Sequence, residues 1–194
     1  MVTLHEYQER GLNLLNNALE KFNTILVITP TGGGKSVMTA RFVKSYNKKT
    51  IIITHRQEIL KHLSLALAAD NVEHRIEANK DIVNFIINAH IAKFNKHFIR
   101  FNSIVRLSMI DTMNSKKYDQ TFIKDASLWI VDEAHHILKN NKWGKIISLV
   151  PKDAKGVGFT ANSVRGDGKG LGINSHGVFE HLITVISMSE LLEK

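Results

Sequence analysis

The sequence contains no cysteine and only two prolines among its 194 residues. A chain without cysteine has neither disulfides nor thiolate metal sites, which suits a reducing cytoplasm. No apolar run approaches the roughly 20 residues that span a bilayer, and residues 1–6 lack the basic and then apolar pattern of a secretion signal. We therefore expect a protein that is neither secreted nor in a membrane, located in the cytoplasm or, if viral, the host cytoplasm.

Aromatic residues make up only 7% of the chain, but 43% of its residues are hydrophobic, enough to bury the core of a single domain. The 26 Lys and Arg residues outnumber the 18 Asp and Glu residues, which gives a formal charge of +8. Such an excess favours polyanionic partners such as nucleic acid, although many basic proteins bind none.

Three of the 12 glycines are consecutive, in the segment 29–36, which reads Thr-Pro-Thr-Gly-Gly-Gly-Lys-Ser. The segment joins an apolar run, residues 25–28, to an apolar helical pattern. A glycine-rich loop in that position directs backbone N–H groups and the positive end of a helix dipole toward phosphates. Lys35 would reach the β and γ phosphates, and Ser36 would coordinate Mg²⁺. The predicted nucleotide-binding residues here are Thr31, Gly32, Gly33, Gly34, Lys35, Ser36 and Val37.

A pair of acidic residues follows a second apolar run, residues 128–131. This pattern places Asp132 and Glu133 at the carboxyl end of a buried strand, where ligands of open α/β sheets bind. Asp132 would hold Mg²⁺ directly or through water, and Glu133 would orient and deprotonate the attacking water. A tight turn and a solvated strand end are the inert alternatives, but the two segments in this order favour ATP and Mg²⁺ as cofactors.

Apolar periodicity predicts helices that alternate with strands. The predicted helices cover residues 4–22, 57–69 and 81–101, and the predicted strands cover residues 25–28, 50–54, 104–110, 126–131 and 154–160. This alternation predicts one α/β domain with a parallel sheet and helices on both faces. Residues 162–177 are rich in glycine and predict an exposed loop.

Taken in order, these motifs resemble the first RecA-like motor domain of superfamily 2 helicases, in the DEAH-containing group that includes repair and phage helicases. The resemblance implies a P-loop NTPase fold over residues 1–178, with residues 179–194 beginning the connection to a second RecA-like domain. Residues 132–135 match the DEAH signature, which makes His135 a catalytic residue that couples the nucleotide to the neighbouring domain. The family glutamine that reads the adenine edge corresponds to Gln8, beside His5 where relatives often have Arg.

The resemblance also implies nucleic-acid contacts, on looser matches. His55 and Arg56 lie where a family motif contacts the nucleic-acid backbone, and Ser108 and Thr112 lie where the next strand-binding motif is expected. A solvated charge at a helix start and a plain strand end with a turn are the alternative interpretations of these residues.

Residues 158–162 resemble the motif that links the γ phosphate to domain movement. The match implies coupling roles for Thr160 and Ala161, while Asn162 stands where relatives usually have Thr. The segment 165–171 echoes a stretch that follows this motif in many relatives, and its other interpretation is a solvated glycine loop.

The function that this resemblance implies is a nucleic-acid-dependent ATPase. It would be a monomeric helicase or translocase that hydrolyses ATP, contacts mainly the nucleic-acid backbone and favours DNA over RNA. Two alternatives are a nucleotide- and strand-binding module with little turnover, and an RNA helicase domain. In relatives the arginine finger comes from the second RecA-like domain, so that domain is an expected partner and this chain alone should hydrolyse ATP slowly.

Overall fold

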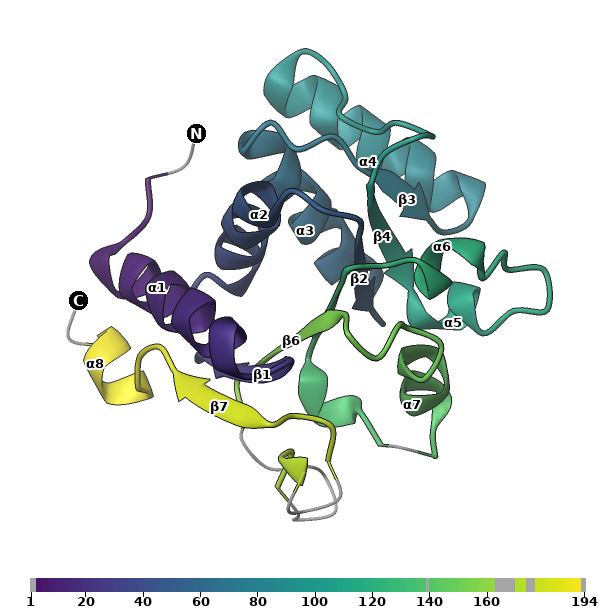
Figure 1. Cartoon of the computed structure of the whole chain (residues 1–194). Coiled ribbons are helices and arrows are strands. Elements are labelled where there is room, and N and C mark those ends of the chain that lie inside the picture. The colour runs from purple at the N-terminus through teal and green to yellow at the C-terminus, as the bar shows by residue number, and fades with distance from the viewer. Residues whose placement is uncertain (1–2, 139, 163–169, 174–176, 193–194) are drawn as a thin grey trace.

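The computed structural model describes residues 3–138, 140–162, 170–173 and 177–192, in which helices and strands alternate (Figure 1). The strands are β1 (Thr24–Ile28), β2 (Thr50–Thr54), β3 (Arg75–Glu77), β4 (Val105–Met109), β5 (Leu128–Asp132), β6 (Lys155–Thr160) and β7 (His181–Thr184). The helices are α1 (Glu6–Lys21), α2 (Lys35–Tyr46), α3 (Gln57–Ala69), α4 (Lys80–Phe94), α5 (Ile110–Met113), α6 (Thr121–Lys124), the 3₁₀ helix η1 (Ala134–His136), α7 (Lys142–Ile147) and α8 (Met188–Leu192).

The described strands form one seven-stranded sheet in the order β3-β4-β2-β5-β6-β1-β7, with every pairing parallel. All residues of β2 and β5 are buried, as their continuous apolar runs predict for strands covered on both faces. The register sets Ile52 of β2 opposite Leu107 and Ile130 of the adjacent strands. Because the strands run in one direction, their carboxyl ends meet at one edge.

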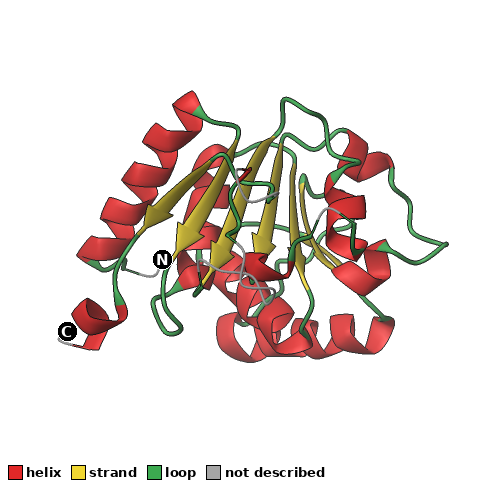
Figure 2. Cartoon of the chain, turned by 90° about the horizontal axis from the view of Figure 1, so that it is seen from below, coloured by secondary structure: helices red, strands yellow, loops and turns green. Residues whose placement is uncertain are grey.

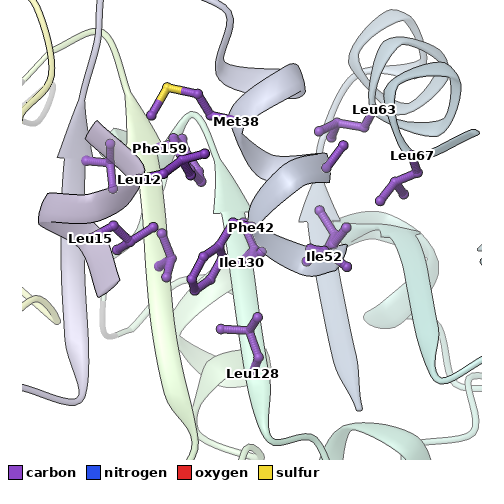
Figure 3. Packing of buried hydrophobic residues seen from close by; sticks show 14 of the residues in the cluster. Leu12, Leu15, Met38, Phe42, Ile52, Leu63, Leu67, Leu128, Ile130 and Phe159 are labelled. Carbon is purple, nitrogen blue, oxygen red and sulfur yellow. The ribbon is translucent and has the colours of Figure 1, made fainter. Parts of the chain in front are cut away.

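Helices cover both faces of the sheet, which confirms the predicted α/β, RecA-like P-loop fold (Figure 2). The long helices α1 to α4 pack on one face, where Leu15, Phe42 and Leu63 belong to the same hydrophobic cluster as Ile130 of the sheet (Figure 3). Short helices pack on the other face, where the core includes Trp143 of α7.

Helix α1 shows how local sequence fixes an element. His5 donates its backbone N–H to Gln8 Oε1 at 2.9 Å, which forms half of a capping box. Gly11 lies on the buried face, and a Cβ there would lie 2.7 Å from Val185 Cγ1. Glycine is therefore needed for α1 to approach the chain that follows β7.

The structure departs from the sequence predictions in two places near β3. This three-residue strand was not predicted, because it is too short to show alternation. The helix predicted for residues 81–101 ends at Phe94, so the prediction is wrong for 95–101. Asn95 has a left-handed φ of 57°, and Ile99 pairs with His74 in an isolated parallel bridge, so that sheet pairing replaces the last helical turns.

The carboxyl-terminal part of the chain joins the same sheet. Strand β7 pairs in parallel with β1, so the sheet continues beyond residue 178, where the predicted domain boundary lies. Of the predicted loop 162–177, residues 163–169 and 174–176 lie outside the described residues, including most of the segment 165–171. Within the described part of the chain, no helix is long and apolar enough to cross a membrane.

Candidate functional site

The P-loop leaves the carboxyl end of β1 and enters α2 at Lys35. Gly32 and Gly34 have φ values of 85° and 81°, in the left-handed region that favours glycine. A side chain at Gly34 would also overlap the amide of Gln8. This geometry directs the amino terminus of the 12-residue α2 outward, where its dipole attracts anions.

A pocket of about 350 Å³ lies at this helix terminus. It is lined by Thr31, Gly32, Gly34, Lys35, Ser36, Val37, Ile59, His62, Asp132 and Glu133. The fold thus brings the P-loop and the acidic pair, which are distant in the sequence, into one cavity. Within the P-loop, Gly33 is buried, and its N–H donates to the Pro30 carbonyl at 3.0 Å.

The Lys35 ammonium folds back on the P-loop. Its Nζ donates to the carbonyl oxygens of Thr29 and Pro30, at 3.3 Å in each case. Bonds of this length are at the weak end of the hydrogen-bond range, so an incoming anion would displace them at little cost.

Asp132 ends β5 and is only 7% exposed. Its Oδ1 is buried and has no hydrogen-bond partner. Burial, followed by the charge of Glu133, raises the pKa of Asp132 to about 6, and Lys35 acts in the opposite direction. A buried carboxylate with an unpaired oxygen beside a lysine has the chemistry of a cation ligand.

Glu133, next in the chain, has a left-handed φ of 55°. This conformation costs a non-glycine residue about 1 kcal/mol or more, and such strain gathers at functional sites. It turns the chain abruptly from β5 into η1, so that Glu133 lines the pocket beside Asp132.

The donor set fits Mg²⁺ carried by a nucleotide. Ser36 and Asp132 both line the pocket and supply oxygen atoms, which Mg²⁺ prefers. Among the described residues there is no group of three His, Cys, Asp or Glu side chains that could hold a metal alone. Mg²⁺ commonly takes one or two protein oxygens and completes its coordination with phosphates, so a sparse set is the expected one.

His135 joins the acidic pair to β6. Its Nδ1 lies 3.1 Å from Thr160 Oγ1 and 3.3 Å from Glu133 Oε2. Thr160 is fully buried and its hydroxyl also accepts the Asn162 N–H at 3.2 Å. The structure therefore brings together the predicted catalytic residue His135 and the predicted coupling residue Thr160, with Ala161 following at the end of the strand.

Gln8 contacts the P-loop. Its Nε2 donates to the Gly33 carbonyl at 3.3 Å, and its Oε1 accepts the His5 N–H. Gln8 is 4% exposed and does not line the pocket, so its interactions in this structure tie α1 to the phosphate-binding loop. The predicted adenine contact stays a prediction.

The predicted nucleic-acid contacts lie at the same sheet edge but differ in exposure. Arg56 is exposed at the amino terminus of α3, and His55 is half-buried beside it. Burial, and then the Arg56 charge, lower the pKa of His55. Thr112 is half-buried in α5.

Ser108 is the exception among these contacts, because it is fully buried. Its hydroxyl donates to the Glu77 carbonyl of β3 at 3.4 Å. The hydroxyl is thus used within the sheet, so its position does not support the nucleic-acid contact predicted for Ser108.

Two pocket residues were missed by the sequence analysis. Ile59 and His62 lie three positions apart on α3 and line the pocket beside the P-loop. A helical spacing of three places both on one face, but the sequence gives no signal that this face adjoins the phosphate site.

The fold is that of a RecA-like P-loop domain. Residues 1–165 match the family described as "Type III restriction enzyme, res subunit" (ResIII). The chain belongs to this family, and the resemblance to superfamily 2 helicases is confirmed. Comparison with the curated proteins gave no match.

Solved structures show the same fold. The UvsW helicase from bacteriophage T4 is 15% identical with a TM-score of 0.66, covering 94% of this chain and 60% of that one. LlaGI, a type ISP restriction-modification enzyme solved with a DNA substrate mimic, is 12% identical with a TM-score of 0.64, covering 99% and 20%. The SWI2/SNF2 ATPase core of Sulfolobus solfataricus, solved with double-stranded DNA, is 18% identical with a TM-score of 0.59, covering 83% and 32%. This chain thus spans less than two thirds of each.

Proposed function

We propose that this chain is the ATP-binding motor domain of a nucleic-acid-dependent ATPase, a DNA helicase or translocase that hydrolyses ATP to ADP and phosphate. The observation that carries the proposal is the shared pocket, in which the P-loop and the pair Asp132–Glu133 line one cavity. The unpaired Asp132 oxygen and the strained Glu133 backbone support the same conclusion.

The roles of the pocket residues follow from their positions. Lys35 would exchange its two carbonyl contacts for the β and γ phosphates. Ser36 and Asp132 would hold Mg²⁺, which when bound neutralises charge on the phosphate oxygens. Glu133 would orient the attacking water and take its proton. His135 and Thr160, bonded to each other beside Glu133, would couple this step to domain movement.

The proposed nucleic-acid partner is DNA, contacted mainly through its backbone. Arg56 is exposed at the sheet edge, and the chain carries a formal charge of +8. Two of the structurally similar proteins were solved with DNA or a DNA mimic. Contacts to phosphates predict binding that is independent of sequence and weakens steeply with salt.

A second candidate function is a nucleotide- and strand-binding module with little turnover. Among the described residues, no arginine lines the pocket. An arginine finger contributes roughly 10³ to 10⁵ in rate in related NTPases, and we propose that a second RecA-like domain supplies it. Hydrolysis by this chain alone would then be slow.

The deciding experiment measures phosphate release with and without nucleic acid. Single-stranded DNA, duplex DNA and single-stranded RNA are compared, with Glu133→Gln as the variant and Glu58→Gln, an exposed glutamate on α3, as the matched control. Stimulation by DNA that Glu133→Gln alone abolishes supports the motor. Background release by a chain that still binds an ATP analogue supports the module, and stronger stimulation by RNA contradicts the choice of DNA.

A further inference from the structure

A row of imidazole rings connects the end of β2 to Glu133. The His55 and His136 ring centroids lie 4.6 Å apart in an edge-on arrangement, and the His136 and His135 centroids lie 4.2 Å apart. His135 Nδ1 is in turn 3.3 Å from Glu133 Oε2. Continuous side-chain contacts therefore run from His55, which follows β2, through two histidines of η1 to the residue proposed to activate water.

The outer end of this row is tied to Arg56. Its Nε donates to His55 Nε2 at 3.2 Å, which places the ring proton of neutral His55 on Nδ1. That Nδ1 is buried and has no hydrogen-bond partner. A phosphate that binds the Arg56 guanidinium would compete for this hydrogen bond and release the His55 ring to reorient.

Helix α7 holds the middle of the row. The Trp143 ring is nearly parallel to that of His136, at 13° and 6.4 Å, and edge-on to that of His55 at 6.2 Å. Asn141, which caps α7, donates its side-chain amide to the His136 carbonyl at 2.7 Å. The His136 ring is thus held between His55, His135 and a buried tryptophan.

His136 itself is exposed, whereas Ala134 and Ile137 on either side are buried. Burial of apolar surface therefore does not explain its place in the row. We infer that His136 is a positioning residue that transmits nucleic-acid binding at His55 and Arg56 to His135, and through His135 to Glu133 and Thr160. This inference rests on the proposed function.

The test measures coupling between the two ligands. Affinity for a non-hydrolysable ATP analogue with Mg²⁺ is measured by calorimetry, with and without saturating oligothymidylate. Allosteric coupling typically changes affinity by about 5-fold or more, and we expect such a ratio for the wild type. In His136→Ala the ratio should fall below about 2-fold, while each ligand alone binds within about 2-fold of the wild type.

Two variants separate transmission from general packing. His136→Phe keeps a ring in the row and should restore the coupling ratio, since the contacts of the His136 side chain are ring contacts. His181→Ala removes another exposed histidine stacked on an aromatic ring, that of Phe22 at 4.7 Å, and should leave the ratio unchanged. Equal loss of coupling in His136→Ala and His181→Ala would overturn the inference.

Tryptophan emission gives an independent readout. The chain has two tryptophans, so Trp129→Phe leaves Trp143 as the reporter within the row. Oligothymidylate should shift Trp143 emission in this background, and His136→Ala should reduce the shift although DNA still binds, because only the contact of Trp143 with His55 then remains. An unchanged shift, or wild-type coupling in His136→Ala, would overturn the inference. A wild type that binds both ligands without coupling contradicts only this inference, whereas failure to bind nucleotide or DNA contradicts the proposed function as well.

Discussion

The carboxyl edge of the sheet and the interior beneath α3 and α4 differ in whether their buried polar atoms have hydrogen-bond partners. In the interior, the Ser64 hydroxyl lies between His74 Nε2 at 2.7 Å and His90 Nε2 at 2.9 Å. Val72 O accepts from His74 Nδ1, and Phe98 N–H donates to His90 Nδ1. These bonds require a proton on His74 Nδ1 and on His90 Nε2, so every ring nitrogen is satisfied when both histidines are neutral.

At the carboxyl edge, by contrast, several buried polar atoms make no hydrogen bond. Eight buried side-chain atoms among the described residues lack a partner, and four of them lie at the carboxyl ends of β1, β2 and β5. They are Thr29 Oγ1, Thr54 Oγ1, His55 Nδ1 and Asp132 Oδ1. An unpaired buried polar atom is costly in a native protein and calls for an explanation, which for Asp132 would be the proposed Mg²⁺. The comparison teaches that satisfied clusters hold the fold together while unsatisfied ones mark the candidate site.

The largest expected effect is a loss of folding stability in acid, which the two interior histidines cause. Burial lowers the pKa of His74 and His90 from 6.5 to about 4. The unfolded chain therefore takes up protons first, so the stabilisation is complete above pH 6.5 and is lost as the pH falls toward 4. Each histidine should lower the free energy of unfolding by about 2 kcal/mol between about pH 7 and about pH 5.

Asp132 acts in the opposite direction, because its raised pKa of about 6 stabilises the folded state as the pH falls. Urea unfolding of Asp132→Asn at several pH values removes this opposing contribution of Asp132. NMR titration of the His74 and His90 rings provides the control, and pKa values near 6.5 in the folded protein would refute this account.

The next largest effect is expected at the carboxyl edge of the sheet. Lys35→Ala removes the ammonium that would meet the β and γ phosphates, and a charged hydrogen bond contributes up to about 3 kcal/mol. Affinity for Mg²⁺ and an ATP analogue, measured by calorimetry, should fall by roughly 100-fold. Lys44→Ala, in the last turn of the same helix, is the matched control. Unchanged nucleotide affinity in Lys35→Ala would mean that the P-loop assignment is wrong.

A smaller effect is expected from Ser64→Ala in the interior. The substitution leaves His74 Nε2 without its donor and His90 Nε2 without its acceptor, which should cost about 2 kcal/mol of unfolding free energy. Ser45→Ala, at an exposed position of α2, should change stability by less than about 0.5 kcal/mol. Equal midpoints for the two variants in urea would show that the cluster is not held by its hydrogen bonds.

The smallest effect is expected from Thr54→Val at the edge. Thr54 is fully buried and its hydroxyl has no partner, so a valine of the same shape removes an unpaired group and breaks no bond. The unfolding free energy should stay within about 0.5 kcal/mol or rise. A loss comparable to that of Ser64→Ala would remove the distinction between the two regions.

Much of the fold could be predicted from the sequence, because the local residue pattern agrees with the burial of the same residues in the folded chain. The apolar runs of β2 and β5 predict buried parallel strands, and both strands are buried at every residue. The consecutive glycines predict a loop between a strand and a helix, and in that loop Gly32 and Gly34 have left-handed backbone. Strand β3 was missed because three residues are too few to show alternation. Residues 95–101 were misjudged because the pairing of Ile99 with His74 joins chain segments that are distant in sequence.

The sequence by itself determined the strands β1, β2, β4, β5 and β6, the phosphate-binding loop and the identity of the acidic pair, because each is encoded within a few consecutive residues. Only the tertiary structure decided that Ile59 and His62 join the pocket, that Ser108 is buried, and that His136 touches both His55 and His135. These facts depend on strand order and register, which bring neighbouring strand ends together at one edge. No local pattern specifies that order.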